Sequence, residues 1–118
     1  MKRLLGIVLF AVFVLSFHSA FAMSGNDLAD GMRAYLKAKK AYTTADYLLA
    51  GNYLGYVQGV AEATASDYSL PNGVTADQLC HIVAKFLDKH PERWSEPASR
   101  LVRNALQEAF PSYLLRNK

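Results

Sequence analysis

Apolar side chains recur at helical spacing in the second half of the chain. After Thr75 they fall at i, i+3, i+4, i+7 and i+8, which places one apolar stripe along a single helix face: Leu79, Ile82, Val83, Phe86 and Leu87. Thr75 and Gln78 have the spacing of a capping box, in which each side chain bonds the backbone N–H of the other residue. His90 ends the pattern because a residue before proline is disfavoured in the α conformation. The pattern therefore predicts a helix between Thr75 and His90.

A second apolar stripe predicts a helix that ends at Pro111. Ser95 is its predicted N-cap, and Pro97 is tolerated in a first turn. The stripe recurs at three- and four-residue intervals through Ala98, Leu101, Val102, Ala105, Leu106, Ala109 and Phe110.

Two further helices are predicted earlier in the chain. Asn26 is the expected N-cap of the first, and its apolar positions are Leu28, Met32, Tyr35 and Leu36. The second is expected to begin at Thr43 or Thr44 and to run to about Ser66, with a buried side formed by Leu49, Tyr53, Tyr56, Val57, Val60 and Thr64. A loop from Asp67 to Gly73 follows, with a turn at its end. The whole pattern predicts an all-α fold, a small bundle of about four helices in one domain.

Three glycines recur every four residues in the second predicted helix. Gly51, Gly55 and Gly59 therefore share one helix face. We interpret them as a face that packs tightly against a neighbouring helix, since glycine permits close backbone approach. On this interpretation Gly55→Leu should cost about 1–3 kcal/mol through overpacking.

The N-terminus has the organisation of a secretory signal peptide. Met1–Arg3 is a positive segment, an apolar run follows from Leu4 to Phe17, and Ala20–Ala22 is a small-residue cleavage site. A membrane anchor is the alternative, but the run is short for a span of about 20 residues. We therefore expect residues 1–22 to be a signal peptide cleaved after Ala22, and residues 23–118 to form a periplasmic helical domain.

Composition excludes several classes of partner. The 96 residues after Ala22 carry 11 Lys and Arg against 10 Asp and Glu, so they lack the basic face of a nucleic-acid-binding protein. We expect no nucleic-acid partner and, after cleavage, no membrane contact.

Cys80 is the only cysteine in the sequence, so a disulfide within the chain is excluded. Stability must come from helix packing.

Candidate chemical groups are few. Asp77 and His81 lie four residues apart, but two ligands are too few for a metal, and we interpret them as a solvated pair. His90 is expected to interact with the last carbonyls of its helix. Cys80 is interpreted as a small buried apolar residue. The sequence predicts no catalytic, cofactor or metal site, and thus a protein that is not an enzyme.

Aromatic residues outside the stripes are candidates for binding another protein, because tyrosine and tryptophan are enriched at interfaces. They could equally be anchors that fold back on the domain, and the sequence leaves both alternatives open. We predict that the loop after the second helix contacts the partner, and that Tyr68 is central unless it covers the gap between the second and third helices. The predicted contact residues are Asp67, Tyr68, Asn72 and Trp94.

Several short motifs, in order, resemble the Rap/Tai immunity-protein family. They are G-Y-V-Q-G at Gly55–Gly59, L-P-N-G-V-T at Leu70–Thr75, Gln78-Leu79, H-P-E at His90–Glu92 and A-L-Q-E-A-F-P at Ala105–Pro111. The resemblance covers about Gly25 to Pro111. It implies a small exported helical protein that protects a bacterium from type VI secretion effectors that are cell-wall amidases. The resemblance implies a periplasmic protein that binds an amidase and occludes the active site of that amidase.

The chain departs from that family at its cysteines. The family pattern usually carries four, and the corresponding positions here are Met32, Tyr53, Ser69 and Ser112. The change resembles the loss of two disulfides and leaves the identity of the partner open. A periplasmic stress or chaperone-like binding protein is the alternative function, and formation of a homodimer also stays open. A hydrolase is disfavoured because the usual catalytic motifs are missing.

Overall fold

The computed structural model describes residues 1–8, 22–37 and 39–113, and within them the chain is all-helical. The packed elements are α2 (Gly25–Leu36), α3 (Thr44–Ala63), α4 (Ala76–Lys89) and α5 (Ala98–Ala109), with the short 3₁₀ helices η2 (Lys39–Ala41), η3 (Ala65–Asp67) and η4 (Pro91–Arg93) between them. Residues 2–8 are also helical. The all-α prediction is confirmed, and α2–α5 are the four predicted helices. Most of the predicted signal peptide, residues 9–21, lies outside the described residues.

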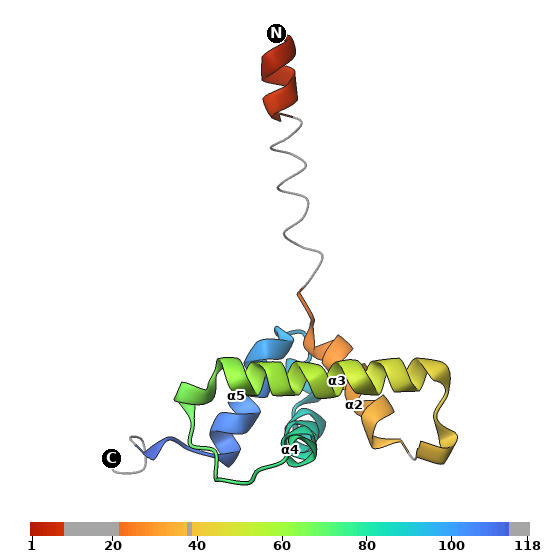
Figure 1. The fold of residues 1–118 in the computed structure, drawn as a ribbon, viewed down its shortest axis with the longest axis vertical. Helices are drawn as coiled ribbons and strands as arrows, with labels where there is room; N and C mark the ends of the chain where they lie inside the picture. The colour runs from red at the N-terminus through yellow and green to blue at the C-terminus, as the bar shows by residue number, and fades with distance from the viewer. Residues whose placement is uncertain (9–21, 38, 114–118) are drawn as a thin grey trace.

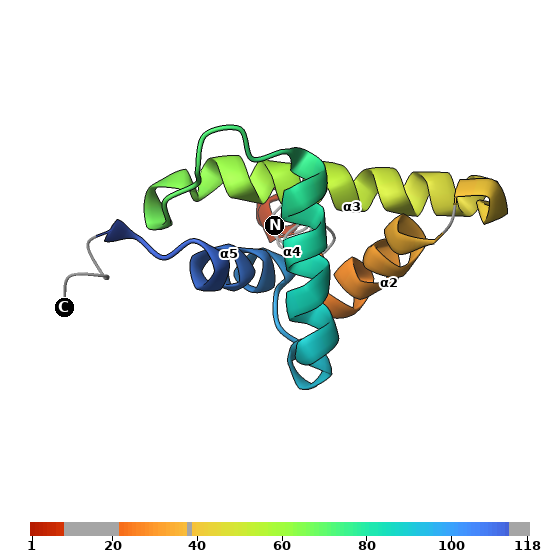
Figure 2. The ribbon, with the colours of Figure 1, turned by 90° about the horizontal axis from the view of Figure 1, so that it is seen from below.

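The four helices form one packed unit around α3. Figure 1 shows α3 running across the domain, and Figure 2 shows α4 crossing it with α2 and α5 on either side of α4. Every pair among the four helices is in contact. None of the helices in the described residues is long and apolar enough to cross a membrane.

Capping boxes begin α3 and α4 where the sequence predicts them. The Thr75 hydroxyl accepts the Gln78 N–H at 3.2 Å, and the Gln78 amide oxygen accepts the Thr75 N–H at 2.8 Å. At α3 the Thr43 N–H donates to the Asp46 carboxylate at 2.8 Å, and Lys37 Nζ lies 2.8 Å from the same oxygen. Hydrogen bonding by Lys37, followed by that of Thr43, lowers the pKa of Asp46 to about 2. The carboxylate therefore stays charged and joins the end of α2 to the start of α3.

Two predicted caps are wrong. Helix α2 is capped by Ser24 through a capping box with Asp27, rather than by Asn26. Helix α5 has no side-chain cap at all, so Ser95 does not fill that role. Its first N–H, from Ala98, donates instead to the Met23 carbonyl at 3.0 Å, while the Gly25 N–H donates to the Glu96 carbonyl at 2.8 Å. The first N–H of each helix thus bonds a backbone carbonyl that precedes the other helix. A sequence pattern does not reveal such a contact.

The core contains residues from all four helices. Tyr53 is its largest fully buried side chain at 1% exposure, and its hydroxyl donates to the Cys80 carbonyl at 2.7 Å. The other large side chains below 2% exposure are Leu28, Val57, Cys80, Val83, Leu87, Leu101, Val102 and Leu106. Burial of Cys80 confirms its interpretation as a core residue. Leu49 is exposed, contrary to prediction, because it lies about 80° around α3 from the buried stripe centred on Val57.

The predicted glycine face is wrong. No atom lies within 4 Å of the position that a Cβ would take at Gly51, Gly55 or Gly59, and all three residues are exposed. The close helix contact involves Gly31 of α2 instead, where a Cβ would lie 2.9 Å from the Tyr53 Cβ and 3.3 Å from the Leu49 carbonyl oxygen. Four-residue spacing correctly places the α3 glycines together, but on the side that faces solvent.

A matched pair of glycine substitutions tests this assignment. Gly31→Ala should lower the free energy of unfolding by about 1–3 kcal/mol, because its methyl group overpacks the contact between α2 and α3. Gly55→Ala should raise the same free energy by about 0.5–1 kcal/mol, since alanine is the better helix former and the site is open. Urea unfolding followed by circular dichroism measures both changes. Equal destabilisation by the two variants would contradict the assignment.

Candidate partner-binding surface

Tyr68 lies in the core rather than on the surface. It is 4% exposed, and its hydroxyl donates to the Ala61 carbonyl at 2.8 Å and lies 2.8 Å from the Thr64 hydroxyl. Its burial favours the alternative in which Tyr68 folds back to cover the gap between the second and third predicted helices, and its hydrogen bonds are to the second. Its neighbour Asp67 accepts a bond from Arg103 Nε of α5 at 2.7 Å, so that carboxylate also has a partner within the domain.

The tip of the loop between η3 and α4 is exposed. The Ser69 N–H donates to the Phe110 carbonyl at 3.2 Å, which holds one end of the loop, and the Thr75 cap holds the other. Between them Pro71, Asn72 and Gly73 are exposed, and Gly73 has a φ of 84°, a conformation that favours glycine. Asn72 is thus the predicted loop residue whose side chain is available to another protein.

Trp94 lies apart from this loop, following η4 near the opposite end of α4. Its indole N–H donates to the Leu87 carbonyl at 3.0 Å, and the Arg33 guanidinium lies 4.9 Å from the centre of its ring. The side chain is half-buried. The four predicted contact residues therefore do not form a single surface.

The largest hollow described lies where the C-terminal end of α2 meets the N-terminal ends of α3 and α4. It has a volume of about 540 Å³. Its lining includes Tyr35, Tyr42, Tyr47, Asp77 and His81, and we refer to it as the aromatic hollow. Tyr42 and Tyr47 are among the aromatic residues outside the predicted stripes, but Tyr35 and the α4 residues join them only in the folded chain.

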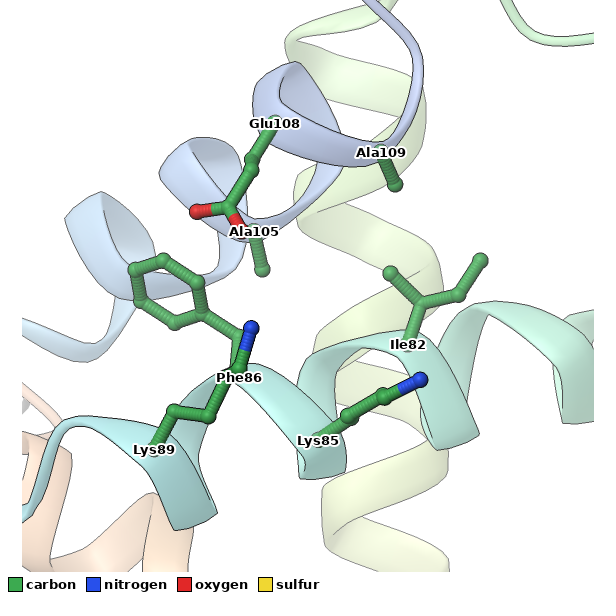
Figure 3. Close-up of a pocket in the computed structure, with 7 residues that line it drawn as sticks. All are labelled: Ile82, Lys85, Phe86, Lys89, Ala105, Glu108 and Ala109. Carbon is green, nitrogen blue, oxygen red and sulfur yellow. The ribbon is translucent and has the colours of Figure 1, made fainter.

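A second, smaller hollow of about 260 Å³ lies between α4 and α5. Lys85 and Lys89 extend from α4 on one side, and Glu108 extends from α5 on the other, with Phe86 between them (Figure 3). Its basic groups thus share the opening with a carboxylate.

The candidate ionisable groups lie in exposed pairs, in the core or packed against it. The Asp77 carboxylate lies 3.5 Å from His81 Nδ1 and both side chains are exposed, which confirms a solvated pair; Asp77 also accepts a bond from the Tyr35 hydroxyl. Burial raises the pKa of Tyr35 well above its usual value and that of Cys80 to about 11, so both groups stay protonated at neutral pH. Within the described residues no group of three or more His, Cys, Asp and Glu could hold a metal ion.

The His90 side chain does not bond the last carbonyls of its helix, contrary to the prediction. Its Nδ1 lies 3.2 Å from a Glu92 carboxylate oxygen, and its ring packs against Phe86 with centres 4.7 Å apart. The helix-end carbonyl of Leu87 is taken instead by the His90 backbone N–H and the Trp94 indole.

The chain matches the model of a known protein family. A family model described as Rap1a immunity proteins matches residues 24–112, which include α2 to α5 and the loop between α3 and α4. No curated protein matches the chain.

Substitutions in the α3–α4 loop separate its buried and exposed parts. Tyr68→Ala should lower the free energy of unfolding by about 3 kcal/mol or more, because it removes a buried ring. Tyr68→Phe should cost about 1 kcal/mol through the lost hydroxyl bonds. Asn72→Ala serves as the exposed control and should leave the melting temperature unchanged. A wild-type melting curve for Tyr68→Ala would show that the ring does not support the fold.

Proposed function

The chain belongs to the Rap1a immunity protein family, and from this premise we propose that it binds a cell-wall amidase effector of a type VI secretion system and occludes the effector's active site. The family match carries the proposal that an effector is the partner. The amidase class comes from the family resemblance of the sequence motifs. The exposed loop tip and the aromatic hollow supply surfaces for a protein partner, and inhibition by binding requires no catalytic group in this chain.

The periplasm is the compartment in which we propose that this binding occurs. An amidase that attacks the cell wall acts there, so its inhibitor must be exported. The fold is compatible with processing after Ala22, because Met23, whose carbonyl accepts the first N–H of α5, would remain in the chain. Cleavage at the predicted site would therefore leave the structural role of Met23 intact.

Protection from a periplasmic amidase tests the proposal. Candidate type VI amidases, beginning with any encoded beside this chain's gene, are directed to the periplasm of a laboratory strain together with the full chain. We expect survival with one such amidase, and a stoichiometric complex of nanomolar affinity that no longer cleaves cell-wall peptides. The matched control is the chain without residues 1–22, which should stay inside the cell and give no protection.

Two outcomes would contradict the proposal. One is that no amidase is bound or inhibited by the exported chain. The other is that the chain binds many unfolded proteins weakly and shows no preference for an amidase, which would favour the chaperone-like alternative.

A further inference from the structure

The aromatic hollow is the described cavity best suited to receive a side chain from another protein. Its volume of about 540 Å³ lies within the range of specific ligand pockets. The floor is formed by small and aliphatic residues, Ala50, Gly51 and Leu54. Because Gly51 lacks a side chain and nothing lies within 4 Å of its missing Cβ, the floor is open to an incoming apolar group.

Two aromatic pairs hold the walls in place before any partner binds. Tyr42 and Tyr47 meet edge to face with ring centres 4.9 Å apart, and Tyr35 and His81 do so at 5.8 Å. The Tyr42 hydroxyl donates to the Tyr35 carbonyl at 2.9 Å, and the Tyr35 hydroxyl donates to Asp77. Preformed walls reduce the conformational entropy that binding would otherwise cost. Tyr47 remains 62% exposed, so it is available for contact.

The charged groups of the hollow differ in their partners. Asp46 accepts Lys37 Nζ at 2.8 Å, whereas Asp77 accepts the neutral Tyr35 hydroxyl and faces His81 Nδ1 at 3.5 Å. Both carboxylates thus have a partner within the domain. Lys39, which lines the hollow, has no carboxylate within salt-bridge distance among the described residues. A partner that supplies a carboxylate would be electrostatically complementary.

We propose that the aromatic hollow binds a segment of the effector in which an apolar or aromatic side chain stands next to a carboxylate. This rests on the proposed function. The ring or aliphatic group enters between the two aromatic pairs, and the carboxylate meets Lys39 at the rim. Leu36 and Leu48, which follow the lining residues Tyr35 and Tyr47 in sequence, are also exposed.

A second copy of this chain is a poorer occupant than an acidic segment. A twofold dimer places the same surface of both copies face to face. If the twofold axis passed through the hollow, Lys39 and the neighbouring exposed Lys40 would approach the same residues of the other copy, and like charges in an interface are unfavourable.

Small probes test the chemistry of the hollow without the effector. The chain, purified after export, is titrated with N-acetylphenylalanine, its neutral amide and the cation phenethylamine, and amide chemical shifts are followed by NMR. We expect the carboxylate probe to shift Tyr47, Gly51 and His81 at millimolar concentration, and the neutral amide to bind about two- to fivefold more weakly. Tighter binding of the neutral or cationic probe, or shifts located elsewhere, would overturn the inference.

Two variants then test the hollow against the effector identified by the protection experiment. Tyr47→Ala should raise the Kd about tenfold or more, as for an interface hot spot, and Lys39→Glu should raise it while slowing association. Lys85→Glu is the matched control on the α4–α5 hollow and should change neither. Melting temperatures should stay at the wild-type value, because all three residues are exposed.

The outcomes separate this inference from the proposed function. If the wild-type chain binds an effector and both hollow variants bind it equally tightly, the hollow is not the site, although the immunity function stands. If no effector binds the wild-type chain while the carboxylate probe seats in the hollow, the immunity proposal fails and the carboxylate preference stands.

Discussion

The fold depends on the backbone pairing that joins the start of α2 to the start of α5. Two hydrogen bonds, from Gly25 N–H to Glu96 and from Ala98 N–H to Met23, satisfy donors that helix starts otherwise leave free. The contact is so close that a Cβ at Gly25 would lie 2.6 Å from the Trp94 carbonyl oxygen. The first and last packed helices are thereby fixed to each other, and α3 and α4 complete the core between them.

The sequence resemblance implies cysteines at four positions that hold other residues in this chain, namely Met32, Tyr53, Ser69 and Ser112. Met32 of α2 and Tyr53 of α3 are both buried in the core. Ser69 bonds Phe110 through the backbone, which brings its segment beside the one that contains Ser112. The four positions thus fall into two neighbouring pairs of segments, and each pair is held together without a disulfide. This agrees with a stability that rests on helix packing.

Local signals predicted most of the fold, and tertiary contacts account for what they missed. Thr75 and Gln78 lie three residues apart and form the capping box of α4 with each other, so the local sequence was sufficient to predict it. The start of α5 was predicted wrongly because its N–H partner, Met23, lies more than seventy residues away in sequence. The glycines of α3 share a face by geometry, but that helix is apolar on both sides, and the spacing of the glycines did not show that their side faces solvent. The aromatic hollow was missed because Tyr35, Tyr47 and His81 come from three different helices.

We propose that this disulfide-free bundle binds its effector through the aromatic hollow. Hydrogen–deuterium exchange of the exported chain, alone and with the bound effector, is the decisive measurement. We expect slower exchange on binding at residues 39–51 and 77–81, with little change in α5. Protection confined to α5 and to the α4 residues around Lys85 and Lys89, with the aromatic hollow exchanging as in the free chain, would contradict it.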